Sequence, residues 1–225
     1  MIKFLGDVLK LYVERSDFFL ELLIEHITLS GIAVIIITLI GVSVGIYITR
    51  NEFVASFVIS LTNFLYTIPS IALFGVFAGT IGIGEKAALP ALIIYGLLPV
   101  IRNTYVGIRE VDPLIVESAL AMGVTDRQLL VKVQLPIALP VIFAGFRTMV
   151  VMTIALAGIA SFIGAGGLGV AIWRGITTYF QEMTVAGSFL VALLAIITDL
   201  ILGFIEKRIR KRVLGEEQKG GTLNA

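Results

Sequence analysis

The sequence has no cysteine, one histidine and little charge, and each shortage excludes a class of protein. Without cysteine there is no disulfide scaffold, no cysteine-ligated zinc or iron–sulfur site and no thiol nucleophile. The single histidine, His26, excludes a metal centre built on several histidines. Only 15% of the 225 residues are charged, against about 25% in an ordinary soluble domain, so a water-facing globule is excluded as well.

What the sequence has instead is long apolar runs. Hydrophobic residues make up 58% of the chain, and the mean hydropathy is +1.02. A helix needs about 20 apolar residues to cross a hydrocarbon layer of roughly 30 Å, where lipid cannot pair with backbone groups. We therefore predict an all-α membrane protein of about five spans, over residues 27–49, 53–84, 87–101, 138–163 and 184–205. The second is predicted to be one tilted helix, kinked or loosened at Pro69 and ended by residues 79–82.

Lysine and arginine are distributed unevenly between the two sides of these spans. With the N-terminus outside, eleven of the 17 basic residues lie on the inner side and five on the outer side. Because basic loops favour the cytoplasm, we expect a multi-pass protein of the cell membrane with an outer N-terminus and a cytoplasmic C-terminus. The chain then divides into an outer amphipathic segment (1–26), a transmembrane domain (27–206) and a basic cytoplasmic tail (207–225).

The one sizeable polar stretch between spans, about residues 110–136, reads as a helix, a glycine and a second helix. Asp112-Pro113 predicts an N-cap followed by proline at the first helical position, and Gly123 predicts a left-handed stop. Thr125 to Gln128 has the form of a capping box, and the second helix is predicted to end before Leu135-Pro136. Small and apolar side chains lie side by side here, which indicates a surface that packs against another protein.

This elbow, the helix–glycine–helix segment of about residues 110–136, resembles the EAA loop of permeases in ABC importers. The family pattern is Glu-Ala-Ala, three residues, Gly, nine residues and then Ile-x-Leu-Pro. The matching positions are Glu117, Ser118, Ala119, Gly123, Val133, Leu135 and Pro136, with serine for the middle alanine and valine for isoleucine. Residues 98–105, 144–148 and 162–169 resemble the osmoprotectant branch, which carries glycine betaine, carnitine, choline or proline betaine. The resemblance covers roughly residues 27–212.

The resemblance implies a type I ABC importer fold and a set of partners. Two permease chains, identical or paralogous, form the pore in the lipid bilayer, and each elbow docks on one of two cytoplasmic ATPase subunits. A separate outer binding protein delivers the substrate. ATP and magnesium belong to the ATPase, so this chain is expected to be no enzyme and to bind no cofactor, metal or nucleic acid. Glu117 would offer its charge to the ATPase or to a nearby arginine. The plain alternative is a helix hairpin that only connects two spans.

The chain has no phosphate-binding Gly-x-x-x-x-Gly-Lys-Ser/Thr loop, but it does contain a Gly-x-Gly-x-x-Gly sequence at Gly164, Gly166 and Gly169. A dinucleotide site needs this sequence between a strand and a helix. Here it follows a predicted membrane helix on the outer side. We therefore interpret these glycines as a bent or closely packed loop beside the mouth of the pathway.

Polar residues inside the spans form two further candidates. Arg147 and Asp199 differ in depth by only about 5 Å at ~1.5 Å per helical residue, so we predict that they pair, for structure or for transport. Asn63, Tyr66 and Ser70 recur at i, i+3 and i+7 along the second span. This stripe is interpreted either as a wall of the substrate pathway or as hydrogen bonding between helices.

The sequence leaves three other functions open. The first is a related ABC permease for methionine or another small solute. The second is an ATPase-independent secondary transporter, but such proteins often show internal repeats and midplane carboxylates, and here only Asp199 is an acidic residue well inside a span. The third is a membrane enzyme, for which the sequence offers no cluster of nucleophile, base and metal ligands.

Overall fold

The computed structural model describes residues 2–214, so the part of the predicted basic tail beyond Leu214 lies outside it. The described elements are α1 (Ile2–Glu14), α2 (Ser16–Ile48), α3 (Glu52–Thr67), α4 (Ser70–Ile81), α5 (Glu85–Arg109), α6 (Pro113–Ala121), α7 (Asp126–Leu129), a π-helical turn (Leu130–Gln134), α8 (Leu135–Ala160), a 3-10 turn (Ser161–Ile163), α9 (Gly169–Thr177) and α10 (Gln181–Leu214). Within the described range the regular structure is entirely helical.

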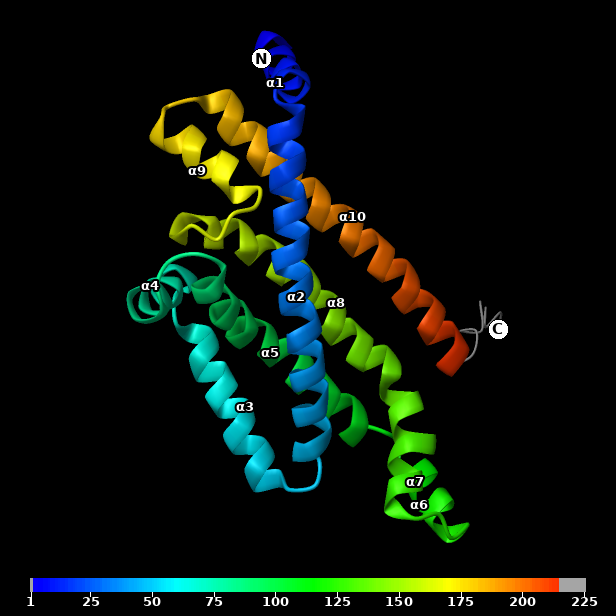
Figure 1. Ribbon diagram of the computed structural model, residues 1–225. Coiled ribbons are helices and arrows are strands. Elements are labelled where there is room, and N and C mark those ends of the chain that lie inside the picture. Colours follow the sequence, from blue (N-terminus) through cyan, green and yellow to red (C-terminus); the bar gives the residue numbers. More distant parts are fainter. Residues whose placement is uncertain (1, 215–225) are drawn as a thin grey trace, which may run out of the picture.

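Long apolar helices run along the molecule (Figure 1), and the elbow of α6 and α7 lies at the opposite end from α1 and α9. Four stretches are long and apolar enough to cross a membrane: residues 16–48, 85–109, 126–163 and 181–213. If the broken pair α3–α4 counts as one span, the total is five, the predicted number of spans.

The second predicted span does bend at Pro69, but it is not one tilted helix. It is two helices, α3 and α4, which meet at an angle of 91°. A residue before proline is disfavoured in the α conformation, and Ile68, which precedes Pro69, is extended with ψ 129°. The break leaves the Ile68 carbonyl outside the helical ladder, where the Tyr95 hydroxyl of α5 donates a hydrogen bond to it.

The centre of the bundle is the packing of α5 between α2 and α8. Fully buried side chains from all three helices meet there, including Ile37, Leu92 and Met149. Glycines let the backbones approach: a Cβ on Gly145 of α8 would lie 2.7 Å from the Pro99 carbonyl oxygen of α5. Small residues at helix contacts are typical of membrane bundles, where close packing replaces the hydrophobic effect between helices.

The outer end, as predicted from the charges, is closed by α1, α9 and the start of α10. One side of α1 buries Val8 and Leu11 in this cluster, whereas Leu5, Leu9 and Val13 on the same helix are exposed. The hydroxyl of Tyr12 donates a hydrogen bond of 2.8 Å to the Ala186 carbonyl of α10. Burial raises the pKa of the Tyr12 hydroxyl above its ordinary value.

Candidate functional site

The elbow between the third and fourth spans is built from the predicted caps. The Asp112 carboxylate accepts a hydrogen bond of 2.9 Å from the Leu114 backbone N–H at the start of α6. Gly123 has φ +80°, the left-handed conformation that ends the helix. The Thr125 hydroxyl and the Gln128 side chain accept reciprocal backbone hydrogen bonds and form the capping box. These predictions are confirmed, and they make the elbow a defined turn rather than a slack loop.

The far boundary of the elbow differs from the prediction. No helix ends before Leu135-Pro136; instead α7 continues through the π-helical turn at Leu130–Gln134 into α8. Pro136 carries no N–H, and the wider turn before it lets the chain stay helical while the proline ring enters the next helix. The second arm of the elbow is therefore the start of the fourth span, so movement of one moves the other.

An apolar groove of about 360 Å³ lies along the elbow. It is lined by Leu114, Ile115, Ser118, Ala119, Met122 and Val133. Leu114 and Met122 are 70% and 78% exposed, which is unusual for large apolar side chains in a water-facing segment. Ser118 donates its hydroxyl to the Leu114 carbonyl at 2.6 Å, so its polar group is turned away from a partner. Glu117 is exposed, and its side chain makes no hydrogen bond or ion pair within residues 2–214.

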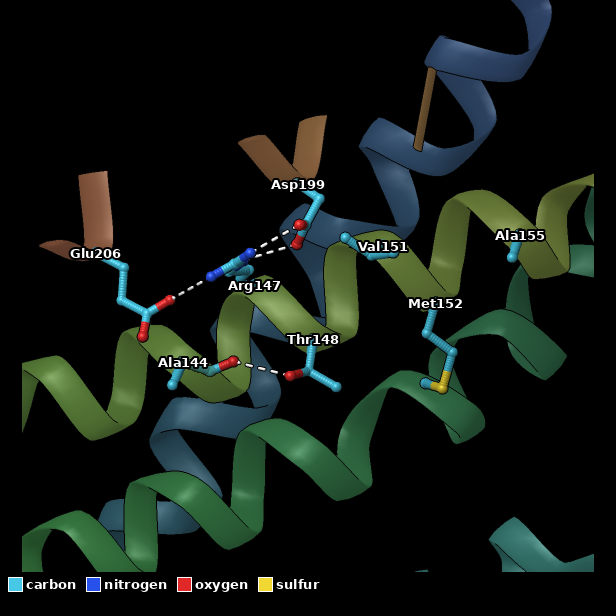
Figure 2. A pocket seen from close by; sticks show the side chains of 8 residues that line it. All are labelled: Ala144, Arg147, Thr148, Val151, Met152, Ala155, Asp199 and Glu206. Atoms are coloured by element: carbon cyan, nitrogen blue, oxygen red, sulfur yellow. Dashed lines mark hydrogen bonds and ion pairs between the residues drawn. The ribbon is translucent and has the colours of Figure 1, made fainter. Parts of the chain in front are cut away.

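Inside the membrane-spanning part, Arg147 of α8 lies between two carboxylates of α10 (Figure 2). Its Nε and Nη2 atoms donate to the two oxygens of Asp199, each at 2.7 Å, and its Nη1 atom donates to Glu206 at 2.9 Å. The structure thus joins the predicted pair and adds Glu206 as a third member. Sequence reasoning missed Glu206 because it stands next to the basic cluster, although its i+7 spacing from Asp199 places both on one helix face.

The same three charged residues line a second groove, of about 570 Å³, between α8 and α10 (Figure 2). The full lining is Ala144, Arg147, Thr148, Val151, Met152, Ala155, Asp199 and Glu206. At the Met152 end the groove reaches α3, because the Tyr66 hydroxyl lies 3.5 Å from the Met152 sulfur. Tyr66 in turn packs edge-on against Tyr95 of α5, with ring centroids 5.6 Å apart.

The polar stripe predicted from Asn63, Tyr66 and Ser70 does not lie on one helix. Asn63 and Tyr66 are exposed on α3, whereas Ser70 is half-buried at the start of α4, beyond the 91° bend. The i+7 spacing assumed a helix through Pro69, which the extended Ile68–Pro69 segment interrupts. Of the three, Tyr66 is the residue that contacts the groove of Figure 2.

The glycine segment after α8 is a bent loop, as interpreted from the sequence. Gly164, Gly166 and Gly167 have φ between +77° and +81°. Gly169 starts α9 directly against the Gly158 carbonyl and has no room for a Cβ. His26, buried on α2, packs against this segment and lies 3.0 Å from the Ile154 carbonyl oxygen. Among residues 2–214, no group of three histidine or acidic side chains is placed to hold a metal ion.

Comparison with known proteins gives close relatives over most of the chain. The carnitine transport permease protein OpuCB of Listeria monocytogenes is 40% identical over 197 residues, covering 88% of this chain and 90% of that protein. The choline transport system permease protein OpuBB of Bacillus subtilis is 41% identical over 185 residues, covering 82% and 85%. The permease/binding protein EgtU of Helicobacter pylori, named for ergothioneine, is 43% identical over 171 residues but is matched over only 30% of its length.

A solved structure and a family description agree with these relatives. The MetNI methionine ABC transporter in an inward-facing conformation has a chain that superposes with a TM-score of 0.73 at 24% identity, covering 82% of this chain and 93% of that one. Residues 37–211 match the family described as binding-protein-dependent transport system inner membrane component. The multi-pass helical fold, the elbow and these relatives identify the chain as a permease of the ABC importer family, in its osmoprotectant branch.

Proposed function

We propose that this chain forms the membrane pathway through which an ABC importer takes up quaternary-ammonium osmoprotectants such as glycine betaine, carnitine, choline and proline betaine. ATP hydrolysis, with its magnesium, takes place on two separate cytoplasmic ATPase subunits, and this chain binds no cofactor. A second permease chain, identical or paralogous, completes the pore, and a separate outer binding protein supplies the substrate.

The observation that carries this proposal is the elbow. Leu114 and Met122 expose large apolar surfaces beside a preformed groove, and a soluble partner that covered them would bury this area favourably. Because the second arm of the elbow continues into α8, a push on the groove reaches the fourth span without crossing a flexible joint. Glu117, Ser118, Ala119 and Gly123, with Leu135 and Pro136, are proposed as the coupling residues.

The proposed orientation follows from the same elbow. If the elbow meets a cytoplasmic ATPase, then five passes place the N-terminus outside and the C-terminus in the cytoplasm. The excess of basic residues on the elbow side and at the end of α10 supports this direction. The glycine segment and α9 then belong to the outer face, where a binding protein arrives.

The substrate class is supported by what the relatives are named for. Carnitine, choline and glycine betaine share a quaternary ammonium group, and they appear in the names of relatives that are 38–41% identical over most of their length. The ergothioneine-named relative is as similar over the part that it shares, so ergothioneine is the second candidate substrate.

The test is uptake by proteoliposomes that contain the permease, its ATPase and its loaded binding protein. We expect uptake of choline or glycine betaine that requires all three components and ATP, and no uptake of methionine. The Met122→Asp variant, altered in the elbow groove, should lose ATPase assembly, whereas Leu120→Asp, exposed two residues earlier near the end of α6 but outside the groove, serves as its control. Uptake by the permease without ATPase subunits would contradict the proposal.

A further inference from the structure

The groove lined by Arg147, Asp199 and Glu206 lies in the membrane-spanning part, where charged side chains are disfavoured. All three residues belong to membrane-spanning helices, and their side chains are 25–39% exposed. A charged side chain against lipid is strongly disfavoured, so such residues face protein or a water-filled space. The groove is therefore placed to face a water-filled space or a second permease chain rather than lipid, on the side of α8 that Tyr66 of α3 also reaches through Met152.

We propose that this groove is a transient binding site within the membrane, here called the station, for the quaternary ammonium head of the substrate as it passes through the permease. The proposal rests on the proposed function for the substrate class. Asp199 and Glu206 provide the negative field, and Arg147 holds the two carboxylates in place. The groove volume of about 570 Å³ falls within the range of small-molecule sites, roughly 300–1,000 Å³.

The walls of the groove suit a cation that cannot donate hydrogen bonds. A quaternary ammonium group has no N–H, so it needs a negative field and apolar contact rather than acceptors in hydrogen-bond geometry. Ala144, Val151, Met152 and Ala155 supply the apolar wall. Thr148 donates its hydroxyl to the Ala144 carbonyl at 3.0 Å, so this hydroxyl is already used within α8 (Figure 2).

The α10 helix leaves room for the Arg147 side chain between its two carboxylates. Asp199 and Glu206 are two helical turns apart, about 10 Å along the axis. Gly203 stands between them, and a Cβ there would lie 3.0 Å from the guanidinium carbon of Arg147. The missing side chain lets the guanidinium lie against α10 and reach both carboxylates at once, so the acidic ends of the groove keep a set spacing.

The Met152 end of the groove adds aromatic surface. Tyr66 is 43% exposed, and its ring packs edge-on against Tyr95. Aromatic faces attract quaternary ammonium ions through cation–π interaction. A substrate that comes from the outer side therefore passes the exposed Tyr66 ring before it reaches the carboxylates, which gives the station two neighbouring surfaces that favour the same head group.

The absence of native cysteine in the chain allows a direct test. In the full-length permease assembled with its ATPase in nanodiscs, the Thr148→Cys variant is treated with a methanethiosulfonate that carries a trimethylammonium group, and with a neutral hydroxyethyl analogue. The groove carries two carboxylates against one guanidinium, and a cleft with a net negative charge raises the local concentration of cations, so we expect the cationic reagent to react about tenfold faster after correction for intrinsic reactivity. Saturating choline should slow both reagents, and adding Glu206→Gln should reduce the cationic preference severalfold.

The Leu200→Cys variant is the matched control, because Leu200 is exposed on α10 next to Asp199 but outside the groove. It should show no choline protection. Asp199→Asn should reduce the cationic preference in the same way, and should that variant fail to fold, Glu206→Gln tests the same negative field two turns further along α10. Equal reagent rates at Thr148→Cys, or no protection by choline in an importer that does take up choline, would overturn the station and leave the proposed function standing. Protection by choline in an importer that moves no quaternary ammonium compound would support the station and refute the proposed function.

Discussion

The carboxylate of Glu25 accepts a hydrogen bond of 2.8 Å from the backbone N–H of Gly167, a residue 142 positions further along the chain. The next residue, His26, lies against the same glycine, where a Cβ would come within 3.1 Å of its Nδ1 atom. Two consecutive side chains of α2 therefore hold the bend after α8, and positive φ at Gly167 lets the chain turn there.

Loss of this hydrogen bond is expected to loosen the glycine segment. Glu25→Ala should cost roughly 1.5–3 kcal/mol, the usual worth of a hydrogen bond to a charged group, and should speed hydrogen exchange in residues 164–169. Glu25→Gln keeps an acceptor and should lose less. Glu21→Ala, exposed one turn earlier on α2, is the control, and equal exchange in all three variants would contradict the role of Glu25.

Two glycines in helices should respond oppositely to alanine. At Gly145 a Cβ would lie 2.5 Å from the Cβ of Asn103, so Gly145→Ala should separate α8 from α5 and lower stability by about 1–3 kcal/mol. At Gly31 nothing lies within 4 Å, so Gly31→Ala should be neutral or stabilise by about 0.5–1 kcal/mol through helix propensity. Thermal unfolding in detergent measures both, and a stable Gly145→Ala protein would argue against the α5–α8 contact.

Arg147 should be coupled energetically to Asp199. Arg147→Gln leaves two carboxylates of α10 without their partner from α8, whereas Arg147→Gln combined with Asp199→Asn removes one of those charges. We therefore expect the single Arg147 variant to melt at a lower temperature than the double variant. A double-mutant cycle on thermal unfolding measures the coupling, and strictly additive effects would show that the pair contributes nothing together.

Gly123 should tolerate only residues that accept its conformation. There is space for a Cβ, but φ is +80°, so Gly123→Val should strain the elbow, while Gly123→Asn should be better accepted. A left-handed residue costs about 1–2 kcal/mol in general, more when the side chain is β-branched. Binding of the ATPase subunit and substrate-stimulated ATP hydrolysis are the measurements. Equal activity of both variants would show that the turn is not needed for coupling.

The form of the elbow could be predicted from the sequence because its helix caps depend on neighbouring residues. Asp112-Pro113, Gly123 and the Thr125–Gln128 box each act within four residues, and each appears in the structure as expected. The length of the second arm was not readable, because a π-helical turn lets a helix pass through Leu135-Pro136 where the usual rule ends it. Pro69 predicted a kink but not its angle of 91°, because the pattern of apolar residues gives length but no direction.

What the sequence alone determined is the membrane location, the number of crossings and the form of the elbow, since apolar length and short-range capping depend only on neighbouring residues. The tertiary structure decided which polar residues meet. Glu206 joins Arg147 and Asp199, Glu25 reaches Gly167, and Tyr66 reaches Met152, because helix rotation and close packing at small residues bring distant positions together. Spacing along one helix defines a face, but only the packed bundle determines what that face meets.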